Sequence, residues 1–360
     1  MAVLLAVPMC CSTRRLFTSA QDRKITVASS TSAVKPSFPV SLLNDPRDVV
    51  FLKTSAFNSL AMVVGVSLFF VTELPWWAGP AYWLMLVLVF IPQFTLMLHC
   101  VVHRPLFKKQ NHWMLLYITW VMAPFHGQTP ETYFVHHIGM HHVEGNLSDD
   151  LSSTMKYQRD NLFHWLRYNT RFMLLGLIEL FLYHRRKNNT KLIRRMLVGE
   201  LTWYAAVAAL CFVNWQATLI VFVVPMLIMR TLMMAGNWGQ HAFVDQDAPD
   251  NDFKSSITCI NTVYNRRCFN DGYHIIHHLK NAMHYTEMML EFDKNREHYG
   301  EQDAIVFDGL DFFSVWLLLM LRQHAMLARR IVPLPGAPER TQEERVAFLK
   351  SRLKPFPVPA

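Results

Sequence analysis

Long apolar runs constrain the fold of this chain more than any other feature of its sequence. Residues 55–71 and 81–98 contain no charged side chain, and residues 196–213 and 217–235 contain one each. Runs of this length match the hydrocarbon thickness of a bilayer, where a backbone satisfies its own hydrogen bonds as a helix. Because only 17% of all residues are charged, we predict an all-α membrane protein with four transmembrane helices in two hairpins.

The basic residues predict how these helices are oriented. The connections at 73–80 and 214–216 contain no lysine, arginine or histidine, whereas the other side carries Lys108, Lys109 and a basic run at 184–195. Since cytoplasmic loops are enriched in basic residues, this second side is predicted to be cytoplasmic. The same bias accounts for the net charge of +8, so no nucleic-acid partner is expected. The basic run could also bind anionic lipid head groups, although orientation alone explains it.

Three further apolar stretches, at 112–124, 171–183 and 309–330, are too short or too interrupted by charge to span. We predict that they are interfacial helices beside a cytoplasmic cap. Glu200 and Arg230 lie about one turn inside the second hairpin. They are expected either to pair with each other or to reach the interface separately.

The chain ends differ in composition from its middle. Residues 1–45 are basic, poor in acids and rich in serine and threonine, which predicts a disordered or targeting segment. Residues 46–330 form the predicted membrane domain, and residues 331–360 form a proline-rich tail with one short charged helix. The six cysteines contain no C-x-x-C pair, so neither a disulfide framework nor a thiolate zinc site is expected.

Histidine is concentrated in four clusters on the predicted cytoplasmic side. The clustered positions are His99, His103, His137, His141, His142, His241, His274, His277 and His278. Residues three or four apart share one face of a helix, so each cluster can direct several imidazoles at one place. Imidazole binds Fe, Zn, Cu and Ni, and nine imidazoles suit two ions better than one.

The chemistry predicted for such a site follows from the motifs around it. The chain lacks H-E-x-x-H, which would indicate a zinc hydrolase, and the Glu-x-x-His pairs of soluble di-iron bundles. A histidine-held di-iron site beside a membrane predicts oxygen activation and attack on an unactivated C–H bond of a lipid chain. A non-catalytic metal-binding or metal-transport protein is a remote alternative, since the predicted spans have no polar residue at their centres.

The clusters resemble the histidine boxes of the membrane fatty acid desaturase superfamily, which includes the integral-membrane alkane hydroxylases. The resemblance covers about residues 45–330. Residues 99–103, 137–142 and 274–278 are similar to the first, second and third boxes. Asn237-x-x-x-His241 resembles an element of stearoyl-CoA desaturases in which the histidine binds metal and the asparagine reaches it through water.

This resemblance implies an O2-dependent desaturase with two iron ions that acts on the acyl chain of an acyl-CoA or an acyl-lipid. A hydroxylase of the same superfamily is the alternative. The chain has no H-P-G-G motif of a fused cytochrome b5 domain, so electrons would come from a separate donor such as cytochrome b5 or ferredoxin. The expected location is the endoplasmic reticulum or an organelle membrane, plastid or mitochondrial.

Two departures from the usual desaturase pattern are informative. The second box has one extra residue, because His137 is followed by Ile138 and the box reads H-x-x-x-H-H. This spacing is closer to the alkane hydroxylases and makes His136 a candidate substitute ligand. Gly272 and Tyr273 before the third box favour the desaturases instead.

Residues near the boxes are candidates for orienting the imidazoles. His284 is a candidate for such a role or for a role beside the substrate, and Asp271 is a candidate acceptor for a ring N–H. Asp245, Asp247 and Glu144 are also near the boxes in the sequence and are candidates for the same role. Six isolated histidines are expected at the surface or the membrane interface: His112, His126, His164, His184, His298 and His324.

Overall fold

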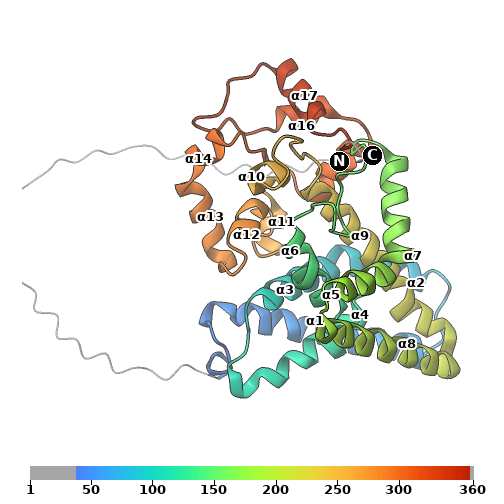
Figure 1. Ribbon diagram of the computed structural model, residues 1–360. Helices are drawn as coiled ribbons and strands as arrows, with labels where there is room; N and C mark the ends of the chain where they lie inside the picture. The colour runs from blue at the N-terminus through green and yellow to red at the C-terminus, as the bar shows by residue number, and fades with distance from the viewer. Residues whose placement is uncertain (1–37, 357–360) are drawn as a thin grey trace, which may run out of the picture. The chain divides into compact units, whose positions relative to one another are not determined.

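The computed structural model describes residues 38–356, so most of the predicted targeting or disordered segment lies outside the described residues. The chain is mainly helical (Figure 1). The long helices and their direct extensions are α1 (Val49–Val71), α2 (Ala78–Met85), η3 (Leu86–Phe90), α3 (Ile91–His103), α7 (Leu162–Arg186), α8 (Thr190–Thr218), η7 (Leu219–Val223) and α9 (Val224–Gln240).

Three helical segments of the described residues are long and apolar enough to cross a membrane. They are Pro46–Val71, Ala78–His103 and Thr190–Gln240. The last has 51 residues, and as a straight helix it would be about 76 Å long, whereas a hydrocarbon core is about 30 Å thick. Many of their apolar side chains are exposed, and Phe212 has 93% of its surface free. Such faces fit contact with lipid.

Asn214 divides the longest segment into two helices that fold back on each other. Its φ and ψ of −157° and 98° are not helical, and its Oδ1 accepts a hydrogen bond from the backbone N–H of Ala217 at 3.0 Å. Asparagine is a favoured N-cap, so this residue ends one helix and begins the next. The guanidinium of Arg230 lies 3.7 Å from the carboxylate of Glu200 across the turn, which confirms the pairing alternative.

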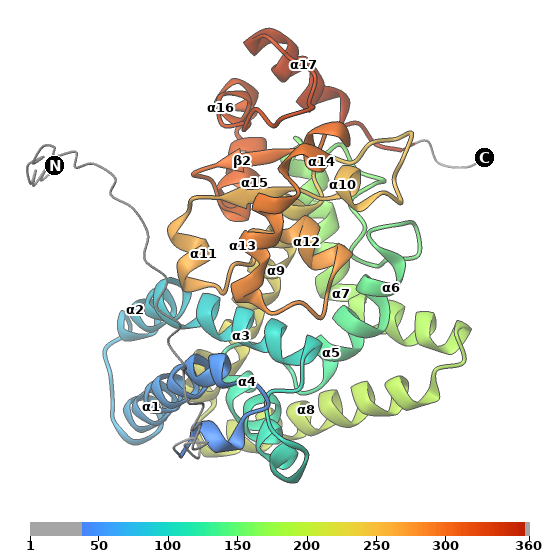
Figure 2. The same ribbon diagram turned by 90° about the vertical axis from the view of Figure 1, so that its left-hand side faces the viewer.

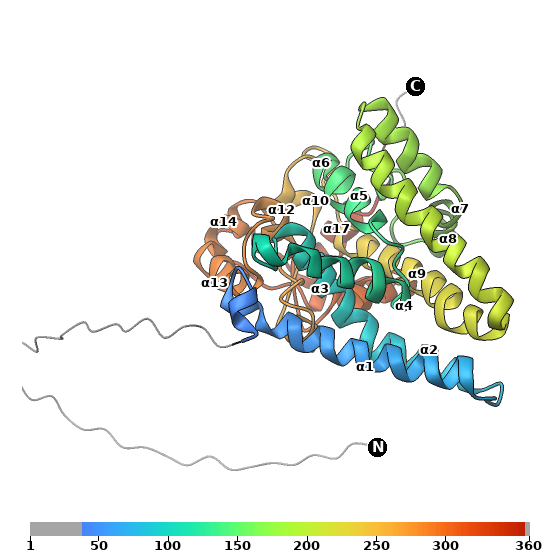
Figure 3. The ribbon, with the colours of Figure 1, turned by 90° about the horizontal axis from the view of Figure 1, so that it is seen from below.

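Shorter helical pieces connect the long segments. They are η1 (Val40–Leu42), η2 (Pro46–Asp48), η4 (Lys109–Met114), η5 (Tyr117–Met122), α4 (Ala123–Phe125), α5 (Thr132–His136), η6 (His137–His141) and α6 (His142–Glu144). The stretch predicted as a helix at 112–124 is thus helical from Lys109 to Phe125. The predicted piece at 171–183 is part of the longer helix α7, which packs beside α8 and α9 (Figure 3).

The C-terminal region, residues 252–356, contains short helices and one small sheet. Its elements are α10 (Asp252–Ser255), β1 (Thr258–Ile260), α11 (Val263–Arg267), α12 (His274–Leu279), α13 (Tyr285–Lys294), α14 (Arg296–Glu301), β2 (Val306–Asp308), α15 (Phe312–Met320), α16 (His324–Arg329) and α17 (Gln342–Ser351). They group together at one end of the long helices (Figure 2), and α15 packs against α9.

The all-α prediction is wrong in one detail, because β1 and β2 form a parallel pair with Thr258 opposite Val306. Both strands are almost fully buried, and Cys259 and Phe307 belong to one apolar core with α15 and α17. A strand of three residues surrounded by core side chains has no alternating pattern, so it is not recognisable from the sequence.

Three isolated histidines are buried, which corrects their predicted position at the surface or interface. His126 stacks on Phe94 with ring centroids 4.2 Å apart, and its Nδ1 donates to the carbonyl of Met122 at 2.9 Å. His324 contacts Asp160 at 2.9 Å. His184 lies against the carbonyl of Val135. Each imidazole has a polar partner within hydrogen-bonding distance of one ring nitrogen, which lowers the free-energy cost of burying the ring.

Candidate metal centre

Four separate elements carry the nine clustered histidines. The last two turns of α3 carry His99 and His103, and the stretch from α5 to α6 carries three more. His241 directly follows α9, and α12 carries the remaining three. The fold brings all nine together from elements that are far apart in the sequence.

The first cluster contains five histidines, each of which contributes one ring nitrogen, and these five nitrogens lie within 4.8 Å of one another. Its members are His99, His103, His137, His142 and His277. The Nε2 atoms are 2.9 Å apart for His99 and His277 and 3.0 Å apart for His103 and His137. Nitrogens bound to one ion at about 2.1 Å and at right angles lie about 3 Å apart. These five residues therefore have the spacing of ligands that share one metal ion.

The second cluster contains four histidines and adjoins the first. Its members are His141, His241, His274 and His278. The Nε2 of His274 lies 3.1 Å from that of His278 and 3.3 Å from that of His241. The rings of His142 and His278, one from each cluster, have centroids only 5.1 Å apart. The arrangement fits two neighbouring ions.

Hydrogen bonds at the outer ring nitrogens, Nδ1, indicate whether the inner ring nitrogens, Nε2, carry a proton or a lone pair. The Nδ1 of His99 contacts Asp271 at 3.1 Å, that of His141 contacts Asp150 at 2.7 Å, and that of His241 contacts the carbonyl of Ser255 at 2.9 Å. An acceptor at Nδ1 fixes the proton there and leaves a lone pair at Nε2. Lone pairs that converge at about 3 Å repel one another unless a cation lies between them, so the residues present fit a bound metal.

The environment also keeps these imidazoles in the form that binds metal. Burial, together with the positive charge that neighbouring imidazoles would carry, lowers the pKa of His274, His277 and His278 well below the ordinary value. The pKa of His137 is lowered in the same way, and that of His241 falls to about 3. Neutral imidazole is the ligand form, so no proton needs to leave at neutral pH.

The extra residue of the second box lies in a turn of π-helix. Residues 137–141 form η6, and the backbone N–H of His142 bonds to the carbonyl of His137, five residues earlier. This wide turn places His142 over His137, with their Nε2 atoms 3.1 Å apart. His136 is outside both clusters, and its buried Nε2 has no hydrogen-bond partner among the described residues.

The structure distinguishes among the carboxylates near the boxes. Asp271 contacts His99 and also accepts from the hydroxyl of Tyr264 at 2.5 Å. Asp245 pairs with Lys254 and Arg352, Glu144 pairs with Lys187, and Asp247 is exposed.

Asp150 was not identified from the sequence. Burial alone would raise its pKa, but the charge that a protonated His141 would carry, together with the hydrogen bond to His141, outweighs burial and holds the pKa well below its usual range. Its position nine residues after His141, in a run of two acids, was the only local signal.

Asn237 and His284 lie in different surroundings. The Asn237 amide donates to the carbonyl of Ser152 and to the hydroxyl of Tyr168, both at 2.8 Å, and the residue lines an apolar cavity beside the clusters. His284 lies 3.0 Å from the carboxylate of Asp48 and 2.7 Å from the hydroxyl of Thr286. It belongs to neither cluster.

A cavity of about 460 Å³ leads to both clusters. Its lining includes His99 and His137 of the first cluster, His141 and His274 of the second, and His136, which belongs to neither. Most of the remaining lining is apolar and comes from α3 and α9. A chain of methylene groups fits such a cavity better than a polar ligand does, because few of its walls offer hydrogen bonds.

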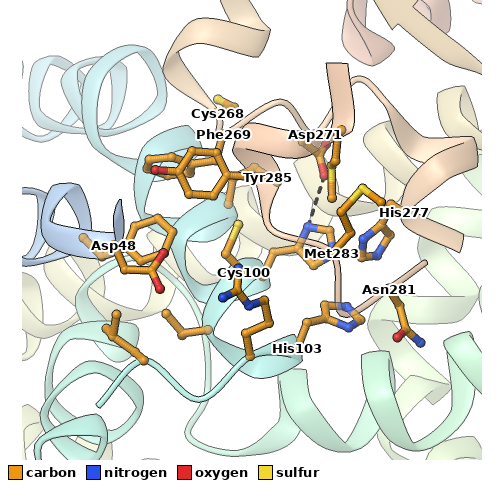
Figure 4. Close-up of a pocket in the computed structure, with 17 residues that line it drawn as sticks. Asp48, Cys100, His103, Cys268, Phe269, Asp271, His277, Asn281, Met283 and Tyr285 are labelled. Carbon is orange, nitrogen blue, oxygen red and sulfur yellow. Dashed lines mark hydrogen bonds and ion pairs between the residues drawn. The ribbon is translucent and has the colours of Figure 1, made fainter. Parts of the chain in front are cut away.

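A much smaller cavity of about 30 Å³ reaches the first cluster from the direction of α1 and α13. Figure 4 shows His103, His277 and Asp271 at its wall. The carboxylate of Asp271 lies 3.1 Å from the Nδ1 of His99, which also lines this cavity. Its volume suffices for about one water molecule. The acyl-sized space next to the clusters is therefore the larger cavity.

Comparison with known proteins agrees with this geometry. The sequence model of the family described as "Fatty acid desaturase" matches residues 53–309, about seven-tenths of the chain. No curated protein and no solved structure gives a significant match. The matched range includes all nine clustered histidines and both acidic partners.

Proposed function

Since the chain belongs to the fatty acid desaturase family, we propose that it is a membrane oxidoreductase that desaturates a lipid acyl chain with O2. The observation that carries this proposal is the pair of adjoining histidine clusters with an apolar cavity against both. The five histidines of the first cluster would together hold one iron ion, and the four of the second cluster would hold the other. Bound there, the two ions would supply O2 activation and oxidation of the C–H bond.

The chain's own residues hold and orient this centre. Asp271 and Asp150 accept the Nδ1 protons of His99 and His141 and thereby direct both Nε2 atoms inward. Such partners also raise the basicity of the ligands. The Asn237 donors are occupied by Ser152 and Tyr168, which leaves its carbonyl oxygen to accept from water, in the role that the resemblance implies.

The large cavity would hold the acyl chain. Apolar side chains such as Ile91 of α3 and Leu232 of α9 form its walls, so they would exclude water from the reacting methylene groups. The acyl chain would pass His99 and His274, which belong to different clusters, and would therefore lie within reach of both ions.

The proposed setting is an integral membrane protein with four crossings. The fold-back at Asn214 supports two crossings within the 51-residue segment, and the basic run at 184–195 supports a cytoplasmic metal centre. The endoplasmic reticulum or an organelle membrane is the proposed location. Electrons would come from a separate carrier such as cytochrome b5 or ferredoxin, and the substrate would be an acyl-CoA or an acyl-lipid.

Hydroxylation of an acyl chain or alkane is the second candidate. The spacing of the second box, with its extra residue, favours it. The Gly272 and Tyr273 pair before the third box favours desaturation. Both reactions begin with removal of one hydrogen from a methylene group, so the same centre serves either.

Expression in a yeast that lacks its own desaturase tests the proposal. Lipid extracts would be analysed by mass spectrometry, where a loss of two daltons indicates desaturation and a gain of sixteen indicates hydroxylation. The purified protein should contain about two iron ions per chain. His274→Ala is expected to abolish the product, with Asp247→Ala, an exposed change outside the centre, as the control.

Two results would contradict the proposal. Unchanged product from His274→Ala would show that the clusters do not carry the reaction. Zinc in place of iron in an otherwise folded protein would support the remote alternative of a non-catalytic metal-binding protein.

A further inference from the structure

An open groove of about 870 Å³ lies away from the candidate metal centre, between α8 and the helical stretch at residues 109–125. Its apolar lining includes Trp113, Leu116 and Val198, and Trp113 has 68% of its surface exposed. Exposed aromatic and aliphatic side chains at the end of a membrane-spanning helix indicate contact with the lipid interface rather than with water.

Three basic residues occupy one face of α8 beside this groove. Lys191, Arg194 and Arg195 are spaced i, i+3 and i+4, and Val198 continues the same stripe at i+7. Residues at these spacings lie on one side of a helix. The stripe therefore changes from cationic to apolar along the helix. A phospholipid changes in the same order, from its charged phosphate group to its apolar acyl chains.

The positive charge of this stripe is only partly balanced. Arg195 forms an ion pair with Glu131 and lies over the ring of Phe134. Lys191 and Arg194 are exposed and form no ion pair within residues 38–356. They also lie in the first turns of α8, where the helix dipole disfavours cations. The groove thus keeps two uncompensated positive charges next to an apolar surface.

From this arrangement we propose that the groove binds an anionic phospholipid of the surrounding membrane, separate from the substrate of the metal centre. Lys191 and Arg194 contact the phosphate-bearing head group, and Trp113, Leu116 and Val198 contact the glycerol and the upper acyl chain. An acidic protein would match the cations but not the exposed apolar half of the groove. The orientation of the membrane helices accounts for basic residues at this end, but not for their alignment on the groove-facing side.

Lipid binding by the purified full-length protein tests this proposal. Protein in mild detergent would be titrated with phosphatidylglycerol or with phosphatidylcholine of the same acyl chains, and bound lipid would be counted by native mass spectrometry. Lys191→Gln with Arg194→Gln should weaken binding of phosphatidylglycerol by about 30-fold, because each basic residue near anionic lipid contributes a factor of roughly five to six and the two factors multiply. Arg185→Gln with Arg186→Gln is the matched control, since both residues are exposed in the same basic run but do not line the groove.

The proposal is supported if phosphatidylglycerol binds better than phosphatidylcholine, only the first pair of changes weakens it, and both variants unfold at the wild-type temperature. Equal weakening by the two pairs would show general charge attraction and overturn it. Stronger binding of soluble glycerol phosphate or of acyl-CoA than of the phospholipid would also overturn it. Because the readout is lipid binding rather than oxidation, its failure is distinguishable from failure of the proposed function.

Discussion

At the scale of single residues, the centre depends on which ring nitrogen of each histidine is anchored. His99, His141 and His241 each have an oxygen acceptor at Nδ1. The acceptors come from three different parts of the chain, so the tautomer of each ring is a consequence of folding. Removing an acceptor should therefore weaken metal binding without removing a ligand.

Asp271→Asn is predicted to lower iron affinity by about tenfold or more, the usual effect of losing a carboxylate partner behind a histidine ligand. Asparagine keeps the shape of the side chain and an acceptor oxygen but loses the negative charge that raises the basicity of His99. Iron retained against a graded chelator would measure the effect. Asp247→Asn, at an exposed carboxylate outside the centre, should leave retention unchanged, and equal retention in both variants would contradict the prediction.

His126 provides a prediction about pH. Burial lowers its pKa from 6.5 to about 4, so the unfolded chain takes up a proton at a pH where the folded chain does not. Its contribution to stability is complete above about pH 6.5 and is lost as the pH falls through 4. Between pH 7 and pH 5 the free energy of unfolding should fall by about 2 kcal/mol from this residue.

His126→Phe keeps the stacking on Phe94 but cannot titrate. The decrease in stability between pH 7 and pH 5, measured on iron-loaded protein by chemical denaturation, should be smaller in this variant than in the wild type by about the same amount. An identical pH dependence in the two proteins would mean that His126 is protonated in the fold.

At the scale of elements, the π-turn of η6 resolves the unusual spacing of the second box. One residue more than the usual box would rotate His142 away from His137 on an α-helix, but the i to i+5 bond of a π-turn restores their alignment. π-turns of this kind occur often at functional sites. The element, rather than a substitute ligand such as His136, accommodates the extra residue.

Deleting Ile138 should leave iron content near two per chain, because His137 and His142 would then lie four residues apart on an ordinary α-helix. Inserting an alanine after Ile138 should instead lose iron, because one π-turn cannot absorb two extra residues. Metal analysis of the two purified variants tests this pair of expectations. Loss of iron from both would show that the surrounding packing, including Gly139 against Leu192, requires the native length.

At the scale of the whole molecule, the C-terminal residues complete the core around the buried guanidinium of Arg159. The side chain of Arg159 is fully buried, and its guanidinium donates to the carbonyls of Arg352 and Lys354 at 2.7 and 2.8 Å. Burial lowers its pKa to about 9. Leu349 and Leu353 belong to the same core cluster as Leu327. The proline-rich tail of the sequence thus packs against residues far earlier in the chain.

Truncation after residue 337 is predicted to destabilise the protein by several kcal/mol, on the order of 2–5, because it exposes this core and leaves a buried guanidinium short of acceptors. The thermal unfolding midpoint of detergent-purified protein measures the change. Removing only residues 357–360 is the control and should have no such effect. A wild-type midpoint after the longer truncation would show that the tail does not contribute to stability.

Local patterns predicted the long apolar helices, the short turn at 214–216 and the nine clustered histidines, and they left the pairing of Glu200 with Arg230 as one of two alternatives. These features depend on apolar run length, charge and spacing, which are properties of neighbouring residues. The buried strands β1 and β2 and the buried positions of His126 and His184 had no such local pattern. They depend on packing partners from other parts of the chain.

The residue pattern alone indicates a helical membrane protein with enough imidazole for two metal ions. How the histidines are divided between the two clusters depends on the packing of the folded chain. Adjacent residues separate, His141 from His142 and His277 from His278, so each contributes to a different cluster. The reason is geometric, because neighbouring side chains on a helix point in directions about 100° apart, and the position of the other helices determines which cluster each one joins.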